Sequence, residues 1–353
     1  VPFLVRPIGG IIFGVLGDKF GRKKILAMTI IIMSVSTFAI GLIPSYATIG
    51  IWAPILLLIA KLAQGFSVGG EYTGAAIYVA EYAPDSRRGF LSSWLDFGSI
   101  SGFVLGAGVV VLITTLLGDA RFEEWGWRIP FFIAGPLGIL GMYLRHALDE
   151  TPTYLKHSES IEAKPVEKES LLTVLRNNTK SILLSVGIVI LTNVTYYMLL
   201  TYMPSYLSFS LGYSADHGVL IIIAIMIGIL FVQPIVGLLS DRFGRKVFIK
   251  IGSIGMLIGA IPSFYLINTG NVGLIFLGLV FLALMLSCFT GVMASILPAI
   301  FPTKVRYSAM ATAFNISVLV AGFTPTLTAW LIELTNNLYV PAFYLMATAF
   351  IGI

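Results

Sequence analysis

Long apolar segments constrain the fold of this chain more than any other feature. Most of them approach the roughly 20 residues that an α-helix needs to cross a bilayer. Only 11% of the 353 residues are charged, whereas soluble globular chains carry about 25%. We therefore predict an all-α, polytopic membrane protein. The apolar segments fall at about 1–16, 25–43, 52–80, 91–117, 128–143, 181–206, 217–239, 247–267, 273–300, 308–332 and 339–353.

The polar connections between these segments alternate in charge. Of the 22 Lys and Arg residues, 18 lie in one set of connections, which comprises 17–24, 83–90, 144–180, 240–250 and 302–307. The alternate connections hold only Arg121. Because cytoplasmic connections of membrane proteins are rich in Lys and Arg, we place the first set in the cytoplasm. The net charge of +5 then follows from topology, and we expect no nucleic-acid partner.

The one long polar connection predicts the domain organisation. We expect an N-terminal helical half at 1–143, a cytoplasmic linker at 144–180 and a C-terminal helical half at 181–353. Five apolar segments precede the linker and six follow it. The first and last segments look incomplete, so we expect a plan of six plus six helices in which the first helix is missing and the last is truncated.

A polar, glycine-rich hinge occurs twice in the chain. Residues 14–26 read GVLGDKFGRKKIL and residues 237–249 read GLLSDRFGRKVFI, with 7 of 13 positions identical. A second pair of related stretches, EYAPDSRRG at 81–89 and AIFPTKVRYS at 299–308, lies at a similar offset. Two halves of one design are typical of secondary transporters, whose binding site lies near the membrane midplane between the repeats.

Each hinge combines a glycine that permits a tight turn with an aspartate that can accept hydrogen bonds from a base or cap the N-terminus of the next helix. One hinge alone is explained as a cytoplasmic turn whose basic residues keep that end of the helix on the cytoplasmic side. Two equivalent hinges favour a latch whose ion pairs hold the cytoplasmic face shut, with Glu81 joined to Arg88 or to a hinge arginine. The candidate gate residues are Asp18, Gly21, Arg22, Glu81, Arg88, Asp241, Gly244 and Arg245.

Four ionisable residues lie within apolar segments: Arg6, Lys61, Glu71 and Asp96. Each would cost about 3 kcal/mol unpaired at mid-bilayer, so they must face one another or a water-filled cavity. At the offset of the repeat, apolar residues stand in the equivalent positions of the second half. Scaffold roles should persist in both halves, so the charges indicate function.

A carboxyl group in a low-dielectric cavity binds a proton more readily than one in water, which is what proton coupling requires. We therefore expect Glu71, with Asp96, to carry the proton. The alternative for Glu71 is a structural ion pair with Arg6 or Lys61. Lys61, Gln64 and Glu71 share one helical face, because their spacings follow the helical period.

The second half offers neutral polar groups in its spans. Aromatic faces suit a quaternary ammonium or a pyrrolidinium ring, and a solute carboxylate suits Arg6 or Lys61. The alternative for the span tyrosines is packing or anchoring at the membrane interface. The candidate substrate-binding residues are Arg6, Lys61, Gln64, Asn193, Tyr196, Tyr197 and Asn315.

The hinge GVLGDKFGRKK resembles the signature loop of the major facilitator superfamily. Narrower stretches, RPIGG at 6–10, AQGFSVGGEYTGAA at 63–76, WGWRIPFF at 125–132 and LDETP at 148–152, resemble its bacterial metabolite:proton symporters. Two more, TNVTYYMLLTYMPSYL at 192–207 and FNISVLVAGFTPTL at 314–327, are similar to the proline/glycine betaine osmoprotectant symporters. The resemblance implies a twelve-helix carrier in a bacterial inner membrane.

We therefore predict a symporter that takes up a zwitterionic compatible solute together with protons, surrounded by membrane lipid. The nearest alternative is a proton-coupled carrier of organic anions such as 2-oxoglutarate or citrate; the four mid-membrane charges, which cancel, argue against it. A membrane-embedded enzyme and a channel are further alternatives. The sequence contains no catalytic cluster and no metal-ligand pattern, so we expect no catalytic site, no metal and no cofactor beyond the proton. It leaves the oligomeric state undetermined.

Overall fold

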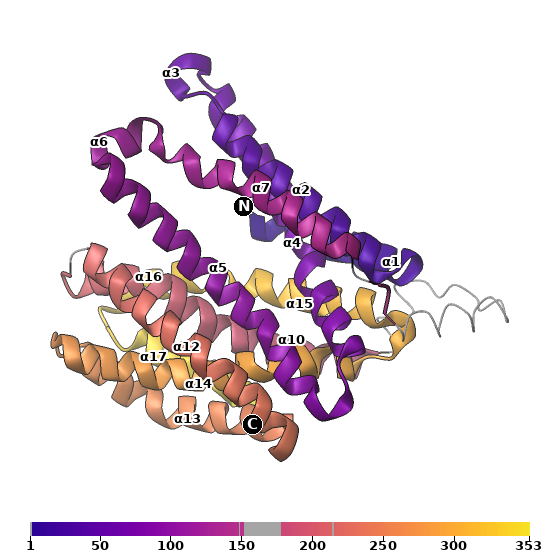
Figure 1. Ribbon diagram of the computed structural model, residues 1–353. Coiled ribbons are helices and arrows are strands. Elements are labelled where there is room, and N and C mark those ends of the chain that lie inside the picture. The colour runs from indigo at the N-terminus through magenta and orange to yellow at the C-terminus, as the bar shows by residue number, and fades with distance from the viewer. Residues whose placement is uncertain (1, 148, 152–177, 214) are drawn as a thin grey trace. The chain divides into compact units, whose positions relative to one another are not determined.

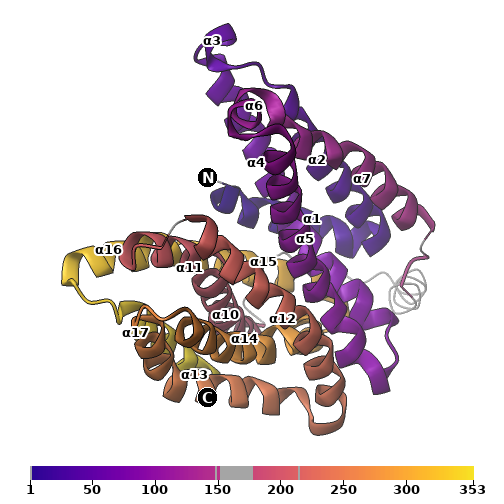
Figure 2. The same ribbon diagram turned by 60° about the vertical axis from the view of Figure 1, so that its left-hand side comes forward.

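The computed structural model describes residues 2–147, 149–151, 178–213 and 215–353 and folds this part of the chain into helices without strands (Figures 1 and 2). The all-α prediction is thus confirmed. Most of the predicted linker, 152–177, lies outside the described residues. In the first half the helices are α1 (Pro2–Phe20), α2 (Arg22–Leu42), α3 (Tyr46–Ile49), α4 (Trp52–Tyr82), α5 (Arg88–Leu117), α6 (Asp119–Arg121) and α7 (Arg128–Ala147).

The second half continues with α-helices and four short π or 3-10 elements. Its elements are α10 (Thr179–Tyr196), η3 (Tyr197–Tyr202), α11 (Met203–Ser205), η4 (Tyr206–Ser210), α12 (Ala215–Phe243), α13 (Arg245–Ile267), α14 (Val272–Ile300), α15 (Arg306–Ala321), α16 (Thr324–Thr335), α17 (Val340–Ala349) and η6 (Phe350–Gly352). The 3-10 turns η1 (Asp85–Arg87) and η5 (Thr303–Val305) precede α5 and α15. Each predicted apolar segment is therefore helical.

Eight helices in the described part of the chain are long and apolar enough to cross a membrane. A ninth candidate combines Asp119–Gly126 with α7, across a bend of 53°. The helix α1 and the short C-terminal α17 correspond to predicted segments but are not among these candidates. The arrangement fits a polytopic membrane protein, as the sequence predicts.

Contacts divide the chain into two compact units, which are described separately. Unit 1 comprises Val1–Tyr82, Leu105–Ile182 and Phe301–Asn315. Unit 2 comprises Ala83–Val104, Leu183–Ile300 and Ile316–Ile353. The first part of α5 therefore packs with elements of the C-terminal half, and the first part of α15 packs with elements of the N-terminal half. The boundaries predicted at 143 and 180 describe the sequence halves and stay a prediction.

Glycines allow the helices of unit 1 to cross at backbone contact. A Cβ atom added at Gly69 of α4 would lie 2.3 Å from the carbonyl oxygen of Arg6, and one added at Gly9 of α1 would lie 2.0 Å from that of Phe66. Small residues at such crossings are typical of membrane helices. The close approach of α1 and α4 fixes the N-terminal hinge relative to the end of α4.

The core of unit 2 is built from α10, α12, α13 and α14, whose buried apolar side chains form one cluster. Phe289 of α14 fills the space beside Gly252 of α13, where a Cβ atom would lie 2.5 Å from the ring. In α14 the buried residues cover most of the helix circumference. This rigid core carries the second hinge at the ends of α12 and α13.

Candidate functional site

The two hinges have the same backbone. Gly21 precedes α2 with φ 96° and Gly244 precedes α13 with φ 89°. Both angles lie in the region that side chains with a Cβ atom rarely adopt. In each hinge this turn lets one helix end and the next begin within one residue.

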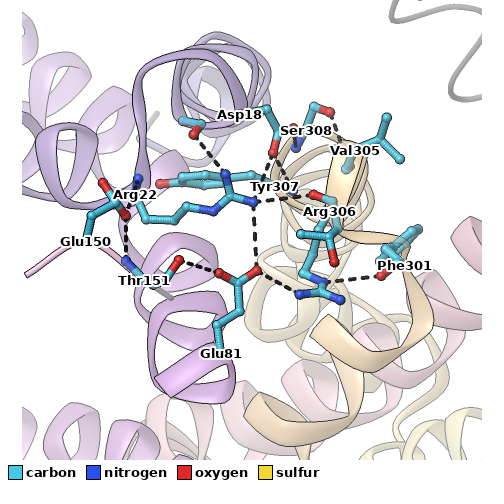
Figure 3. Close-up of polar contacts among 12 residues, drawn as sticks. Asp18, Arg22, Glu81, Glu150, Thr151, Phe301, Val305, Arg306, Tyr307 and Ser308 are labelled. Atoms are coloured by element: carbon cyan, nitrogen blue, oxygen red, sulfur yellow. Dashed lines mark hydrogen bonds and ion pairs between the residues drawn. The ribbon is translucent and has the colours of Figure 1, made fainter. Parts of the chain in front are cut away.

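In unit 1, Asp18 at the end of α1 caps the start of α15. Its carboxylate accepts hydrogen bonds from the backbone N–H groups of Tyr307, at 3.3 Å, and Ser308, at 2.9 Å (Figure 3). The N-terminus of a helix carries unpaired N–H groups and a partial positive charge. The hinge aspartate therefore stabilises the start of α15 in two ways: it accepts hydrogen bonds from the unpaired N–H groups, and its negative charge lies beside the partial positive charge of the helix.

Glu81, near the end of α4, joins two arginines of unit 1. Its Oε1 lies 2.7 Å from Nη1 of Arg306 and 3.8 Å from Nη2 of Arg22, and its Oε2 accepts the hydroxyl of Thr151 at 2.7 Å (Figure 3). The side chains of Glu81 and Arg22 are each 2% exposed. Nη2 of Arg22 also lies 3.5 Å from Asp18. These four charges cancel, as a buried ionic cluster requires.

Glu150 adds a second helix cap to this cluster, and sequence reasoning missed it. Its two carboxylate oxygens accept the N–H groups of Arg22, at 3.1 Å, and Lys23, at 3.2 Å, at the start of α2 (Figure 3). The hydroxyl of Tyr78 donates to the carbonyl of Asp149 at 2.7 Å. The stretch LDETP contained the signal, because an acid placed after a span can cap a neighbouring helix.

In unit 2, Asp241 at the end of α12 caps the start of α5. Its carboxylate accepts the N–H groups of Gly89, at 2.6 Å, and Phe90, at 2.9 Å. Arg245 donates to the carbonyl of Ser295 at 3.0 Å. The aspartates of both hinges thus perform the same capping role. The helix that each one caps is distant in the sequence, α15 or α5, and not the next helix of the chain as the sequence suggested.

Arg88 forms an ion pair with Asp85 at 2.5 Å, and the Asp85 side chain is 90% exposed. Within the described part of the chain, Glu81 therefore forms its ion pairs with Arg22, which is a hinge arginine, and with Arg306, and not with Arg88. A cavity of about 480 Å³ lies beside the second hinge. It is lined by Asp85, Ser240, Asp241, Gly244, Arg245, Lys246, Ile296, Ala299 and Ile300. No equivalent of Glu81 occupies this space.

Glu71 of α4 forms an ion pair with Arg145 in the last turns of α7, with Nη2 and Oε1 3.1 Å apart. The two side chains are 27% and 19% exposed, respectively. Arg145 also donates to the carbonyl of Leu26. The ion pair thus uses neither of the expected partners, Arg6 and Lys61. The sequence analysis placed Arg145 in the linker, whereas in the structure Arg145 belongs to α7, which ends at Ala147.

Asp96 lies in the part of α5 that belongs to unit 2, and it is 5% exposed. Its carboxyl group is close enough to the hydroxyl of Tyr196 on α10 for the two to interact electrostatically. The ring of Tyr196 also contacts Phe103, with the ring centroids 6.1 Å apart. Asp96 is thus a buried acid beside a polar aromatic side chain.

The predicted substrate residues of unit 1 have varied surroundings. The Arg6 guanidinium stacks over Phe3 at 5.3 Å, and Lys61 is partly buried. Gln64 donates to the hydroxyl of Thr37 on α2 at 2.6 Å. Asn315 is buried and donates to the carbonyls of Gly69, at 2.6 Å, and Ala311, at 2.8 Å. The amide groups of Gln64 and Asn315 are therefore already engaged in helix contacts.

The predicted substrate residues of unit 2 cluster at the end of α10. The Asn193 amide donates to the carbonyl of Val189, one turn back, at 3.0 Å. The rings of Tyr196 and Tyr197 meet edge to face, with their centroids 5.9 Å apart. Both tyrosines are partly buried. The aromatic surface that the sequence suggested is present within this unit.

No group of three His, Cys, Asp or Glu side chains in the described part of the chain could hold a metal ion. The single cysteine, Cys288, is buried in α14. The polar chemistry described here thus consists of ion pairs, helix caps and amide groups.

The profile of the Major Facilitator Superfamily matches residues 1–269 and 219–353. The chain belongs to this superfamily. It is 67% identical to the proline/betaine transporter of Escherichia coli (strain K12), across 100% of this chain and 72% of that protein. The glycine betaine/proline/ectoine/pipecolic acid transporter OusA of Dickeya dadantii (strain 3937) has the same identity and coverage. The ectoine/proline transporter ProP of Corynebacterium glutamicum is 42% identical, across 98% of this chain and 71% of that protein.

Solved structures of the superfamily have the same fold. The proton:xylose symporter XylE bound to 6-bromo-6-deoxy-D-glucose aligns with a TM-score of 0.79 at 22% identity, over 99% of this chain and 82% of that chain. FucP in the outward conformation aligns with a TM-score of 0.72 at 13% identity, over 99% and 87%. The chain is therefore an integral membrane protein with the major facilitator fold.

Proposed function

We propose that this protein is a symporter that takes up zwitterionic compatible solutes, such as proline and glycine betaine, together with protons across a bacterial inner membrane. The 67% identity across the whole chain to a proline/betaine transporter carries this proposal. Transport, rather than catalysis, is the activity that we assign. The proton is the only coupling species that the proposal needs.

The hinges support alternating access as the mechanism. Asp18 and Asp241 each hold the first turn of a distant helix, and Glu81 pairs with the buried Arg22 and the partly buried Arg306. These contacts stabilise one conformation and must break when the cytoplasmic face opens. The repeat of the hinge in both halves is the arrangement expected for two bundles that rock about a central site.

The proton acts through Glu71 and Asp96 in this proposal. The Glu71 carboxylate is held by Arg145 at 3.1 Å, and protonation of Glu71 would remove the charge that holds this base. A side chain that is about a quarter exposed can exchange protons with water. Asp96 is more deeply buried, at 5% exposed.

Different residues would bind the two charged ends of the solute. Its carboxylate would pair with Arg6 or Lys61, because both lie in apolar helices and carry a full charge. Its ammonium group would lie against Tyr196 and Tyr197, whose faces attract cations.

A carrier of organic anions is the second candidate function. Uptake of 2-oxoglutarate distinguishes this carrier from one for zwitterions.

The experiment is uptake of labelled proline, glycine betaine and 2-oxoglutarate into vesicles that contain the purified protein, with and without an inward proton gradient. We expect gradient-driven accumulation of the two zwitterions only. The variants Glu71→Gln and Asp96→Asn should abolish accumulation but retain exchange of labelled for unlabelled solute. Glu333→Gln, which changes an exposed carboxylate on α16, is the matched control. Full accumulation by Glu71→Gln and by Asp96→Asn would contradict the proton assignment.

A further inference from the structure

Gln233 of α12 is a buried amide without a hydrogen-bond partner. Its side chain is 0% exposed, and neither its oxygen nor its nitrogen makes a hydrogen bond within the described part of the chain. A buried polar group that makes no hydrogen bond destabilises a fold, because it has lost its contacts with water. A leucine would fill the same space without this penalty, so the amide points to a partner that it binds during function.

The contacts between α5 and α12 show which part of α5 faces Gln233. Asp241 of α12 caps the first turn of α5. One turn further along both helices, a Cβ atom added at Gly237 would lie 2.5 Å from Oγ of Ser93. The two helices therefore run antiparallel within unit 2, with residue numbers rising along α5 as they fall along α12.

The pattern of burial continues this register. On this part of α5 the buried residues are Gly89, Ser92, Ser93, Asp96 and Ile100. On α12 the buried residues near the hinge are Ile229, Gln233, Val236, Gly237 and Ser240. One turn beyond Ser93 on α5 is Asp96, and one turn beyond Gly237 on α12 is Gln233. The register thus places the turn of α12 that carries the buried amide opposite the turn of α5 that carries the buried acid.

A side-chain amide is a neutral group that can serve both forms of a carboxyl. Its N–H donates to a carboxylate, and its carbonyl accepts the O–H of a carboxylic acid. The titratable group that faces Asp96 from α10 is Tyr196, with Tyr197 beside it. Residues 229–237 of α12 contain no titratable side chain. Asp241 lies eight residues from Gln233, about 12 Å along the helix.

We propose that Gln233 is a positioning residue for the proton on Asp96. Within the described part of the chain its amide has no hydrogen-bond partner in this conformation, and it would hydrogen-bond to this carboxyl group, in either protonation state, when the transport cycle brings the two side chains together. The proposal deepens the proton-coupled function assigned above and rests on it. Gln233 would keep Asp96 oriented while the proton is loaded and released. It would do so without adding a charge, which would fix the carboxyl in one state.

The test measures gradient-driven proline uptake as a function of external pH. In Gln233→Leu the carboxylate loses a charge-assisted hydrogen bond, which is stronger than the neutral bond that the acid loses. Asp96 therefore holds its proton to higher pH, and the pH of half-maximal uptake should rise by about one unit. Gln233→Met, which is unbranched like glutamine, repeats the test if the leucine variant does not fold. Val236→Ala, a packing change on the same buried face, should leave the midpoint unchanged.

Two further arms separate this inference from the proposed function. In an Asp96→Asn background, Gln233→Leu should leave the remaining pH profile of solute exchange unchanged. An unshifted midpoint in both folded Gln233 variants, with Asp96 intact, would overturn the role of Gln233 alone. A shift that persists in the Asp96→Asn background would also overturn it. Full proton-driven accumulation by Asp96→Asn itself would instead overturn the proton role of Asp96, and with it the basis of the inference.

Discussion

The two hinges share a backbone but differ in charge. In both, an aspartate accepts two N–H groups at the start of a distant helix, and a glycine with positive φ follows three residues later. In unit 1 the cap is joined to the buried cluster around Glu81. In unit 2 the position that aligns with Glu81 is Ala299, and a cavity of about 480 Å³ lies there instead.

This difference distinguishes two roles of the repeated motif, namely capping a helix and forming an ionic latch. The helix cap is common to both hinges, so it is the structural part of the motif. The bridging acid is present once, so we expect the first hinge to be the stronger latch. Arg245 and Arg88, which align with Arg22 and Arg306, contact a carbonyl group and an exposed aspartate. We therefore expect the second hinge to open at a lower energetic cost.

The largest effect is expected from Glu81→Gln. The change leaves the guanidinium of Arg22, which is 2% exposed, and that of Arg306 without their shared carboxylate. Removal of one member of a buried ion pair costs about 3–5 kcal/mol. We expect a large fall in the midpoint of thermal unfolding in detergent. Asp85→Asn, which breaks the exposed ion pair of the second hinge, is the control and should leave the midpoint unchanged. Equal effects of the two changes would remove the distinction between the hinges.

The next comparison is Asp18→Ala against Asp241→Ala. Each variant removes a helix cap, which costs about 1 kcal/mol. The first also removes a carboxylate 3.5 Å from buried Arg22, so its total cost should reach about 2 kcal/mol or more. Unfolding of the two variants side by side measures the difference. A larger loss in Asp241→Ala would mean that the second hinge is the stronger one.

The third comparison should show no difference between the hinges. Gly21→Ala and Gly244→Ala each force a Cβ atom into a backbone with φ of 96° or 89°. The strain amounts to about 1–2 kcal/mol, and no heavy atom lies within 4 Å of a Cβ atom added at Gly244. We expect similar losses of stability in both variants. A markedly smaller loss at either position would show that its turn relaxes.

The sequence predicted the features that follow from local patterns. The apolar segments predicted the helices. The repeated GRK hinges predicted a capping role for Asp18 and Asp241, although on the next helix and not on the distant helices α15 and α5. The placement of the basic connections in the cytoplasm stays a prediction. Pairing between distant helices was harder. Glu71 pairs with Arg145 because α7 extends further than its apolar run, and Glu150 caps α2 across 128 positions. Neither contact has a periodic signal in the chain, because both depend on how the helices pack.

The orphan amide of Gln233 shows the same limit. A glutamine in an apolar helix can face a neighbour, water or a solute, and the sequence does not distinguish these. Only the register of α5 on α12 places its turn opposite the turn that carries Asp96.

The smallest expected effect comes from filling the position that the second hinge leaves empty. In Ala299→Glu the new carboxylate would enter a cavity lined by Arg245 and would offer Arg245 and Arg88 the partner that Glu81 offers Arg22 and Arg306. Because the cavity is partly open, the gain in stability should be about 1 kcal/mol or less. Transport should change more than stability, because a second closed latch must open in each cycle. We expect slower proline uptake with an unchanged pH midpoint, and Ala299→Gln, which has the same shape without the charge, should have nearly normal rates. Normal uptake by a folded Ala299→Glu would show that opening of the second hinge does not limit the transport cycle.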